Sequence, residues 1–235
     1  MNNQATTSVF DEDRAANYDK LFAKLAPMRD ALHFLTRLVL SERPDDAQVL
    51  CVGAGTGSEL LYLAQQFPQW QFTAVDPAAP MLNRCRQKAE EAGIASRCTF
   101  HIGYLDSLPA SDTFDAATCI LVSHFIMQRE ERHNFFRQIS GRLHPNGYLV
   151  NADLASDMSS PAYKSVLKVC VRSLQYAEIP AEEIEKIISL YGQSIAVLPQ
   201  QEVESIIASS GFEAPVLFCQ TLLIHAWYAR AIVVR

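Results

Sequence analysis

One stretch decides the fold of this chain, and it reads Val49-Leu50-Cys51-Val52-Gly53-Ala54-Gly55-Thr56-Gly57-Ser58-Glu59. Its first four residues are apolar and predict a buried strand, and a helical pattern begins directly after it. The glycines between strand and helix allow the backbone to turn tightly and to approach a ligand closely. The helix N-terminus offers free N–H groups to that ligand. Asp76 ends the next predicted strand, where a carboxylate can accept both ribose hydroxyls of a nucleotide.

Short apolar runs alternate with helical patterns on both sides of this stretch. We expect strands over residues 48–52, 72–76, 98–102, 114–122 and 147–152. We expect helices over 60–67, 80–92, 130–143 and 200–209, and a closing hairpin over 215–219 and 221–233. Short apolar strands that alternate with helices indicate a parallel sheet buried on both faces. The predicted fold is α/β: a Rossmann-like, doubly wound sheet in three α/β/α layers, mostly parallel, with a C-terminal antiparallel hairpin.

The same patterns predict a single domain over residues 1–235 with four parts. Helices within 9–43 precede a nucleotide-binding core over 47–155. Residues 156–198 interrupt the alternation with two consecutive helices, the first beginning at Ser159-Ser160-Pro161. Their apolar faces predict a helical cap over one edge of the sheet. Residues 199–235 hold the last helix and the hairpin.

Composition and charge exclude several classes of protein. The formal net charge is −6 without a block of basic residues, which argues against binding through nucleic-acid phosphates. Six cysteines are scattered without a Cys-x-x-Cys pair, as is typical of reduced thiols. No apolar run reaches the roughly 18 residues of a membrane span, and the start lacks a signal-peptide pattern. We expect a cytoplasmic protein that binds neither nucleic acid nor membrane, and we find no metal-ligand spacing.

The spacing of the glycines bears on the kind of nucleotide. A dinucleotide fingerprint is Gly-x-Gly-x-x-Gly, whereas here the third glycine comes one position early and Ser58 stands in its place. The loop therefore suits a ligand without a pyrophosphate. A tight turn without any ligand and a dehydrogenase remain as alternatives.

Residues 49–154 resemble a class I S-adenosylmethionine-dependent methyltransferase. The resemblance rests on the glycine loop, Asp76, Leu108-Pro109, the apolar run 114–122 and the turn Leu143-His144-Pro145-Asn146-Gly147-Tyr148. The opening pattern Phe10-Asp-x-x-Arg14-Ala15-x-x-Tyr18-Asp19 is similar to the N-terminal segment that folds over the cofactor in this family.

The resemblance implies S-adenosylmethionine as the cofactor, S-adenosylhomocysteine as the product, and a set of binding residues. The loop backbone and the residues after the fourth strand would line the methionyl part. Asp76 would hold the ribose, and the Leu105 N–H would meet the adenine edge. The implied cofactor-binding set is Gly53, Ala54, Gly55, Gly57, Asp76, Pro77, Met81, Leu105, Leu121, Val122 and Tyr18.

Two positions depart from the family pattern. The family usually has an acid where Cys51 stands, near the cofactor amine, and an aspartate where Tyr104 stands, near the adenine amino group. Asp106, two residues on, is a candidate replacement for the second acid. Each lost charge-assisted hydrogen bond would typically be worth ~1.5–3 kcal/mol, so cofactor binding could be weak or unusual.

His124 and Tyr18 are the candidate catalytic residues. His124 follows the fourth strand, where parallel sheets place their ligand crevice, and could act as a base or bind substrate. Asp153, at the end of the fifth strand, is a weaker candidate at the rim. Tyr163 and Tyr191 on the cap helices could line a pocket, although their spacing fits core packing better. His225 and Trp227 read as residues of the last strand.

The function that these patterns favour is methyl transfer to a small-molecule acceptor, mainly by positioning, because a cap encloses a pocket rather than displaying a groove. A carboxy-S-adenosylmethionine synthase-like enzyme that modifies the cofactor is an alternative suggested by residues 211–220, although residues 203–210 lack the arginine of that family and Ile206 stands near its place. A non-catalytic nucleotide-binding module is a second alternative. Apolar cap residues also favour a homodimer.

Overall fold

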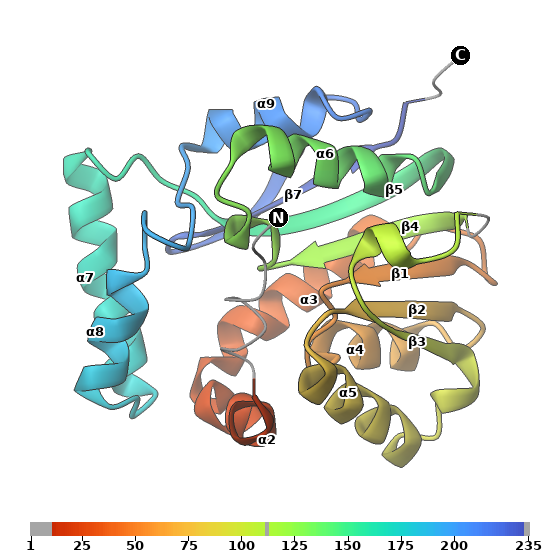
Figure 1. Ribbon diagram of the computed structural model, residues 1–235, viewed down its shortest axis with the longest axis horizontal. Coiled ribbons are helices and arrows are strands. Elements are labelled where there is room, and N and C mark those ends of the chain that lie inside the picture. Colours follow the sequence, from red (N-terminus) through yellow and green to blue (C-terminus); the bar gives the residue numbers. More distant parts are fainter. Residues whose placement is uncertain (1–10, 111–112, 233–235) are drawn as a thin grey trace.

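The computed structural model describes residues 11–110 and 113–232, which form a seven-stranded sheet with helices on both faces (Figure 1). The strands are β1 (Gln48–Val52), β2 (Gln71–Asp76), β3 (Cys98–Ile102), β4 (Phe114–Ile120), β5 (Leu143–Leu154), β6 (Val216–Thr221) and β7 (Ile224–Arg230). Their order is β3-β2-β1-β4-β5-β7-β6; β1 to β5 pair in parallel, and β7 pairs antiparallel with both β5 and β6. This arrangement confirms the predicted α/β sheet with its C-terminal hairpin.

The strand order reverses between β1 and β4, the neighbours at the centre of the sheet. Connections from these two strands leave in opposite directions, so a crevice opens at their carboxyl ends. The glycine loop follows β1, and the segment containing His124 follows β4. The topology therefore brings the strongest ligand-binding motif and the histidine candidate to the same edge of the sheet.

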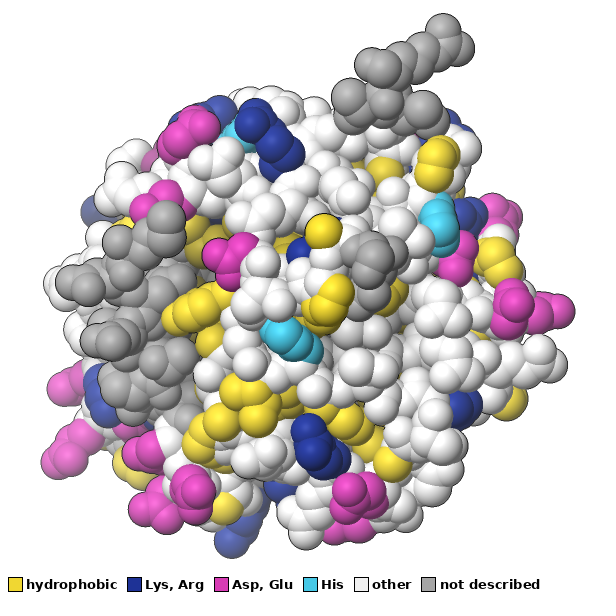
Figure 2. Space-filling view, turned by 45° about the vertical axis from the view of Figure 1, so that its right-hand side comes forward, with side chains coloured by type: hydrophobic (Ala, Val, Ile, Leu, Met, Phe, Trp, Pro, Cys, Tyr) yellow, Lys and Arg dark blue, Asp and Glu magenta, His cyan; other side chains and the backbone are white. Residues whose placement is uncertain are grey.

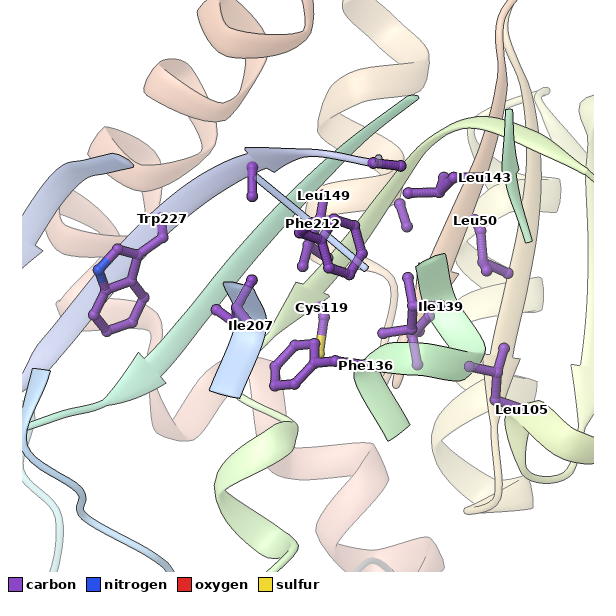
Figure 3. Packing of buried hydrophobic residues seen from close by; sticks show 14 of the residues in the cluster. Leu50, Leu105, Cys119, Phe136, Ile139, Leu143, Leu149, Ile207, Phe212 and Trp227 are labelled. Carbon is purple, nitrogen blue, oxygen red and sulfur yellow. The ribbon is translucent and has the colours of Figure 1, made fainter. Parts of the chain in front are cut away.

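Helices cover the two faces of the sheet separately. Helices α3 (Ala26–Leu40), α4 (Ser58–Gln66) and α5 (Ala79–Glu91) lie on one face, and α6 (Arg129–Ser140) and α9 (Gln200–Ala208) lie on the other (Figure 1). Figure 3 shows the second core, where Phe136 of α6 and Ile207 of α9 pack against Cys119 and Leu149 of the sheet. Alternation along β1 sends Leu50 to this core and Cys51 to the opposite one.

The N-terminal helix spans two parts of the molecule. Helix α2 (Glu12–Leu21) is capped by Asp11, whose side chain accepts a hydrogen bond of 2.8 Å from the Arg14 N–H. Leu21 and Phe22 pack in one apolar cluster with residues of α7 (Pro161–Tyr176) and α8 (Ala181–Ser189). Arg14 also forms a part-buried ion pair of 2.9 Å with Glu183 of α8. Helix α2 therefore connects the inserted helices α7 and α8 to the part of the protein that carries the glycine loop.

Two strand boundaries differ from the expectation. Strand β4 ends at Ile120 rather than at residue 122, because Leu121 has a φ of 60° and donates its N–H to the Ala152 carbonyl over 2.7 Å. Strand β5 begins at Leu143 rather than at residue 147, since an irregularity in β4 lets Leu143 pair with Phe114.

Helix and hairpin ends also shift by a few residues. The helical region expected within residues 9–43 divides into α2, a 3₁₀ turn at Ala23–Leu25 and α3. Helix α6 ends at Ser140, before Gly141. In the hairpin, β6 continues to Thr221, beyond the predicted end at residue 219, and β7 begins at Ile224 rather than at residue 221. The spacing of apolar residues indicates a helix but does not show where a 3₁₀ turn or a glycine ends it.

Candidate active site

The acid that ends β2, Asp76, fixes the backbone of the glycine loop by hydrogen bonding. Gly53, Gly55 and Gly57 have φ values of 65°, 53° and 79°, in the left-handed region that favours glycine. The Asp76 Oδ2 accepts the Gly55 N–H over 2.8 Å, and the Oδ1 accepts the Ala78 N–H over 2.8 Å. Burial raises the pKa of Asp76, and these two backbone hydrogen bonds oppose that rise. Each oxygen keeps a further lone pair, which is what a ribose diol requires.

Gly57 has a packing role in this loop. A Cβ at Gly57 would lie 2.3 Å from the Cys85 Sγ on α5, so its hydrogen allows α4 and α5 to approach each other. Gly57 is also absent from the residues that line the cavity described below, unlike Gly53, Ala54 and Gly55. We therefore assign Gly57 to helix packing rather than to cofactor contact.

Gly57→Ala should destabilise the protein more than Gly93→Ala. Both residues have φ values near 75°, at 79° and 71°, so both variants carry the left-handed strain of roughly 1–2 kcal/mol. A Cβ at Gly93 meets no atom within 4 Å, whereas the one at Gly57 collides with Cys85. Overpacking typically adds about 1–3 kcal/mol, which should appear as the difference between the two urea-denaturation curves. Equal losses would show that α5 moves away freely.

A cavity of about 1310 Å³ opens at the carboxyl ends of β1, β2 and β4. Its walls come from the glycine loop, α2, α3, the segments after β2, β3 and β4, and the inserted helices. The predicted residues that line it are Tyr18, Gly53, Ala54, Gly55, Asp76, Pro77, Met81, Leu105, Leu121, Val122, His124 and Tyr191. The structure thus brings nearly all of the predicted cofactor residues to one space.

One of the two departures from the family pattern lies in the wall of this cavity, and the other lies in the core. Tyr104 and Asp106 both line the wall after β3, so Asp106 is placed where it can face the same ligand as Leu105. The Cys51 side chain is fully buried beneath α4, and burial raises the pKa of its thiol. Cys51 is therefore a neutral core residue and cannot take over the role of an acid.

Tyr18 and Asp19 anchor α2 on the glycine loop. Tyr18 packs with Ala15, Ala78 and Met81, and burial raises the pKa of its phenol. The Asp19 carboxylate accepts hydrogen bonds from the Thr56 hydroxyl over 2.7 Å and from the Lys88 ammonium over 2.8 Å. Burial opposes ionisation of Asp19, but these bonds hold its pKa below the usual range.

A buried polar network supports His124. Its Nδ1 lies 3.0 Å from the Asp153 Oδ1, and since an ionised carboxylate only accepts, Nδ1 carries the proton. Asp153 also accepts hydrogen bonds from the Arg132 guanidinium over 2.7 Å, from the Asn151 amide over 3.2 Å and from the Ser123 hydroxyl. Burial alone would raise the pKa of Asp153, yet Arg132 and these donors hold it well below its usual range. Asp153 therefore stays ionised and orients the imidazole, leaving Nε2 as the second ring nitrogen.

The remaining candidate residues from the sequence are buried in the protein and do not line the cavity. Asp153 itself is fully buried beneath His124 rather than on the rim. Tyr163 packs in the apolar cluster under the inserted helices and does not line the cavity. His225 and Trp227 lie buried in β7, as expected from the sequence.

Glu59 is a buried site residue that the sequence reading missed. It occupies the first turn of α4, where an acid normally reads as a partner of the helix dipole. Its side chain instead turns inward, is only 7% exposed and contributes to the cavity wall. Burial raises its pKa to about 7. Along residues 11–110 and 113–232, no cluster of three or more His, Cys, Asp or Glu residues is arranged to hold a metal ion.

The molecular surface shows no dominant charge on the face drawn in Figure 2. Lys and Arg side chains are interspersed there with Asp and Glu, and hydrophobic side chains are exposed in small groups. Among the helices that the structure describes, none combines the length and the apolar character needed to cross a bilayer.

Strand order, glycine loop and the acid after β2 define a Rossmann-like fold with a candidate ligand site. Residues 49–147 match the family model of a methyltransferase domain. Residues of this chain are 31% identical, over 115 positions, to the biotin biosynthesis bifunctional protein BioHC of Teredinibacter turnerae; the match covers 46% of this chain and 20% of that protein. The chain thus spans about a fifth of the length of this curated relative.

Solved structures agree with that match. An O-methyltransferase-like protein of Nostoc punctiforme superposes with a TM-score of 0.65 at 20% identity, covering 90% of this chain and 59% of that one. An O-methyltransferase family 2 protein of Planctomyces limnophilus, in complex with apigenin, gives a TM-score of 0.62 at 18% identity and covers 94% and 62%. The chain therefore contains a region similar to methyltransferase domains and shares the fold of these solved structures.

Proposed function

We propose that this protein binds S-adenosylmethionine and transfers its methyl group to an oxygen atom of a small, largely apolar molecule. The observation that carries the proposal is His124, which lines the same cavity as the glycine loop and is oriented by the buried Asp153. A histidine held in this way is suited to remove a proton from an acceptor hydroxyl.

The cavity supports both ligands. Gly53, Ala54, Gly55 and Asp76 form the side that fits an adenosyl amino acid, with one lone pair of each Asp76 oxygen left for the ribose. The remaining walls are mostly apolar and come from the turn after β4, the end of β5, the inserted helical segment and the hairpin turn, namely Phe125, Leu154, Leu174, Ile187, Leu190, Ile195 and Leu223. Such walls favour a small apolar acceptor, and several structural neighbours carry the name O-methyltransferase.

The residues of this chain act mainly by positioning. When bound, the cofactor supplies a methyl group activated by a positively charged sulfur. The apolar wall holds the acceptor so that its oxygen faces that methyl group, and such positioning is worth roughly 7–11 kcal/mol. His124 Nε2 accepts the hydroxyl proton as the oxygen–carbon bond forms. Asp153 remains ionised and stabilises the resulting imidazolium.

Release of S-adenosylhomocysteine tests the proposal. The protein is incubated with S-adenosylmethionine and a panel of small phenols, enols, carboxylic acids, amines and thiols, and product formation is measured. We expect turnover with at least one of the phenols, enols or carboxylic acids, and none with the amines or thiols. Binding of the cofactor without any turnover would instead favour the non-catalytic module, and turnover of an amine would contradict the oxygen acceptor.

Asp76→Ala should weaken S-adenosylhomocysteine binding by at least tenfold, or about 1.4 kcal/mol, because the variant loses the ribose acceptor and the bond to the loop. Asp115→Ala is the matched control. Asp115 accepts the Gln48 N–H over 2.8 Å at the opposite end of β1 and does not line the cavity. Calorimetry should show unchanged affinity in the control. Unchanged affinity in Asp76→Ala would place the ribose elsewhere.

The cofactor-modifying alternative finds no support on α9. Residues 203–210 contain no arginine, and Ile206 is buried in the core between α9 and the sheet. None of the residues of α9 lines the cavity. A carboxylate added to the cofactor would therefore meet no cation from this helix.

A further inference from the structure

We propose that Glu59 binds the α-ammonium group at the amino-acid end of the cofactor. This inference rests on the proposed use of S-adenosylmethionine and names a binding residue for it. Glu59 follows the glycine loop directly, as the second residue of α4, and its side chain lines the same cavity as Gly53 and Gly55. The position puts an acidic group beside the part of the loop expected to meet the methionyl end.

Among the described residues, the carboxylate of Glu59 has only two hydrogen-bond partners, the Thr118 hydroxyl and the N–H of its own backbone. The Thr118 hydroxyl on β4 donates to its Oε1 over 3.4 Å, the long end of the range for such a bond. Within the part of the chain that the structure describes, no Lys, Arg or His nitrogen lies within 4.0 Å of its carboxylate. Lys88 of α5 lowers the pKa of Glu59 through its charge, but its ammonium is paired with Asp19 at 2.8 Å. Glu59 therefore has no direct ion-pair partner among the described residues.

An uncompensated buried carboxylate is costly, and most proteins pair it or keep it neutral. Burial and the neighbouring Asp76 raise the pKa of Glu59, to about 7, which reflects this cost. A cation that entered the cavity would remove the cost by supplying the missing partner. The amino-acid end of the cofactor carries one such cation in both substrate and product, whereas the charge on sulfur exists only in the substrate.

The neighbouring charged groups fit an amino-acid zwitterion. Arg29 of α3 lines the cavity and carries a positive charge on the helix next to α4. His33, one turn further on, is neutral because burial lowers its pKa to about 4. An acid on α4 and a cation on α3 thus line one cavity, although the Arg29 guanidinium also pairs with Asp30 over 2.9 Å.

Two nucleotides and two variants test the inference by calorimetry. S-adenosylhomocysteine carries the amino-acid end, and 5′-methylthioadenosine lacks it but keeps the adenosine. Glu59→Gln, which preserves the shape and removes the charge, should weaken S-adenosylhomocysteine binding tenfold or more and change 5′-methylthioadenosine binding less than twofold. Asp76→Asn, the control at the ribose, should weaken both nucleotides alike.

A stability measurement separates binding from a structural role. Without ligand, Glu59→Gln should unfold at the same temperature as the natural protein or higher, because it removes an unpaired buried charge. A variant that unfolds earlier or fails to fold would show that Glu59 serves the fold, and would overturn the inference.

The nucleotide results also distinguish this inference from the proposed function. Equal effects of Glu59→Gln on the two nucleotides, or no effect, would overturn the role of Glu59 while leaving the methyltransferase assignment standing. A natural protein that binds neither nucleotide would overturn both together.

Discussion

His124→Gln is expected to lower the rate constant of methyl transfer by about 10²–10⁴-fold, the usual contribution of a general base. Glutamine cannot take up the acceptor proton, and it also loses the ordered geometry that Asp153 imposes over 3.0 Å on the imidazole. Affinity for S-adenosylhomocysteine should stay within about twofold, because His124 would act on the acceptor and not on the cofactor. Single-turnover rates and calorimetry provide the two readouts.

His144→Gln is the matched control for this variant. His144 is exposed at the start of β5, outside the cavity. We expect natural rates in this control. A His124→Gln enzyme with natural rates would mean that the acceptor arrives already ionised and that positioning alone accelerates the transfer.

Asp153→Asn is expected to reduce the free energy of unfolding by about 3–5 kcal/mol. The variant leaves the Arg132 guanidinium, whose side chain is 1% exposed, buried without its counterion. The Nη1 of Arg132 already has no hydrogen-bond partner among the described residues, so little else compensates for the charge. Urea denaturation followed by circular dichroism measures the loss.

An exposed ion pair shows how much of this effect comes from burial. Arg230 and Glu213 lie 2.8 Å apart with side chains about half exposed, at 46% and 50%. Glu213→Gln should cost less than about 1 kcal/mol, because water screens the pair. Similar losses in Asp153→Asn and Glu213→Gln would contradict the assignment of Asp153 to a tight buried network.

Acid should remove the contribution of Asp153 in the natural protein. The folded-state pKa lies below the unfolded value of about 3.9, so the stabilisation is fully present above that pH. It declines as the pH falls from there toward the folded-state pKa. The difference in stability between the natural protein and Asp153→Asn should therefore shrink below about pH 4 and stay constant above about pH 5.

Local patterns were enough to predict the nucleotide-binding half. The apolar runs at β1 and β2, the glycines after β1 and Asp76 depend on interactions within a few residues or between neighbouring strands. Strand alternation and the left-handed backbone of glycine are properties that a sequence displays directly. The structure places the loop, its acid and most of the predicted cofactor-binding residues in the wall of one cavity.

Long-range packing decided the rest. Glu59 reads locally as an acid at a helix start, and only the docking of α4 on β4 buries its side chain beside Thr118. Gly57 reads as part of a ligand loop, yet the approach of α5 gives its hydrogen a packing role.

The sequence by itself determined an α/β sheet with a nucleotide loop, because hydrophobic period and glycine spacing are encoded residue by residue. Tertiary structure alone decided which charged side chains lie close enough to form ion pairs and hydrogen bonds. Asp153, Arg132 and His124 come from β5, α6 and the turn after β4, and they meet only because the sheet and α6 pack against each other. Electrostatic energy depends on distance and burial, and neither is defined before the chain has folded.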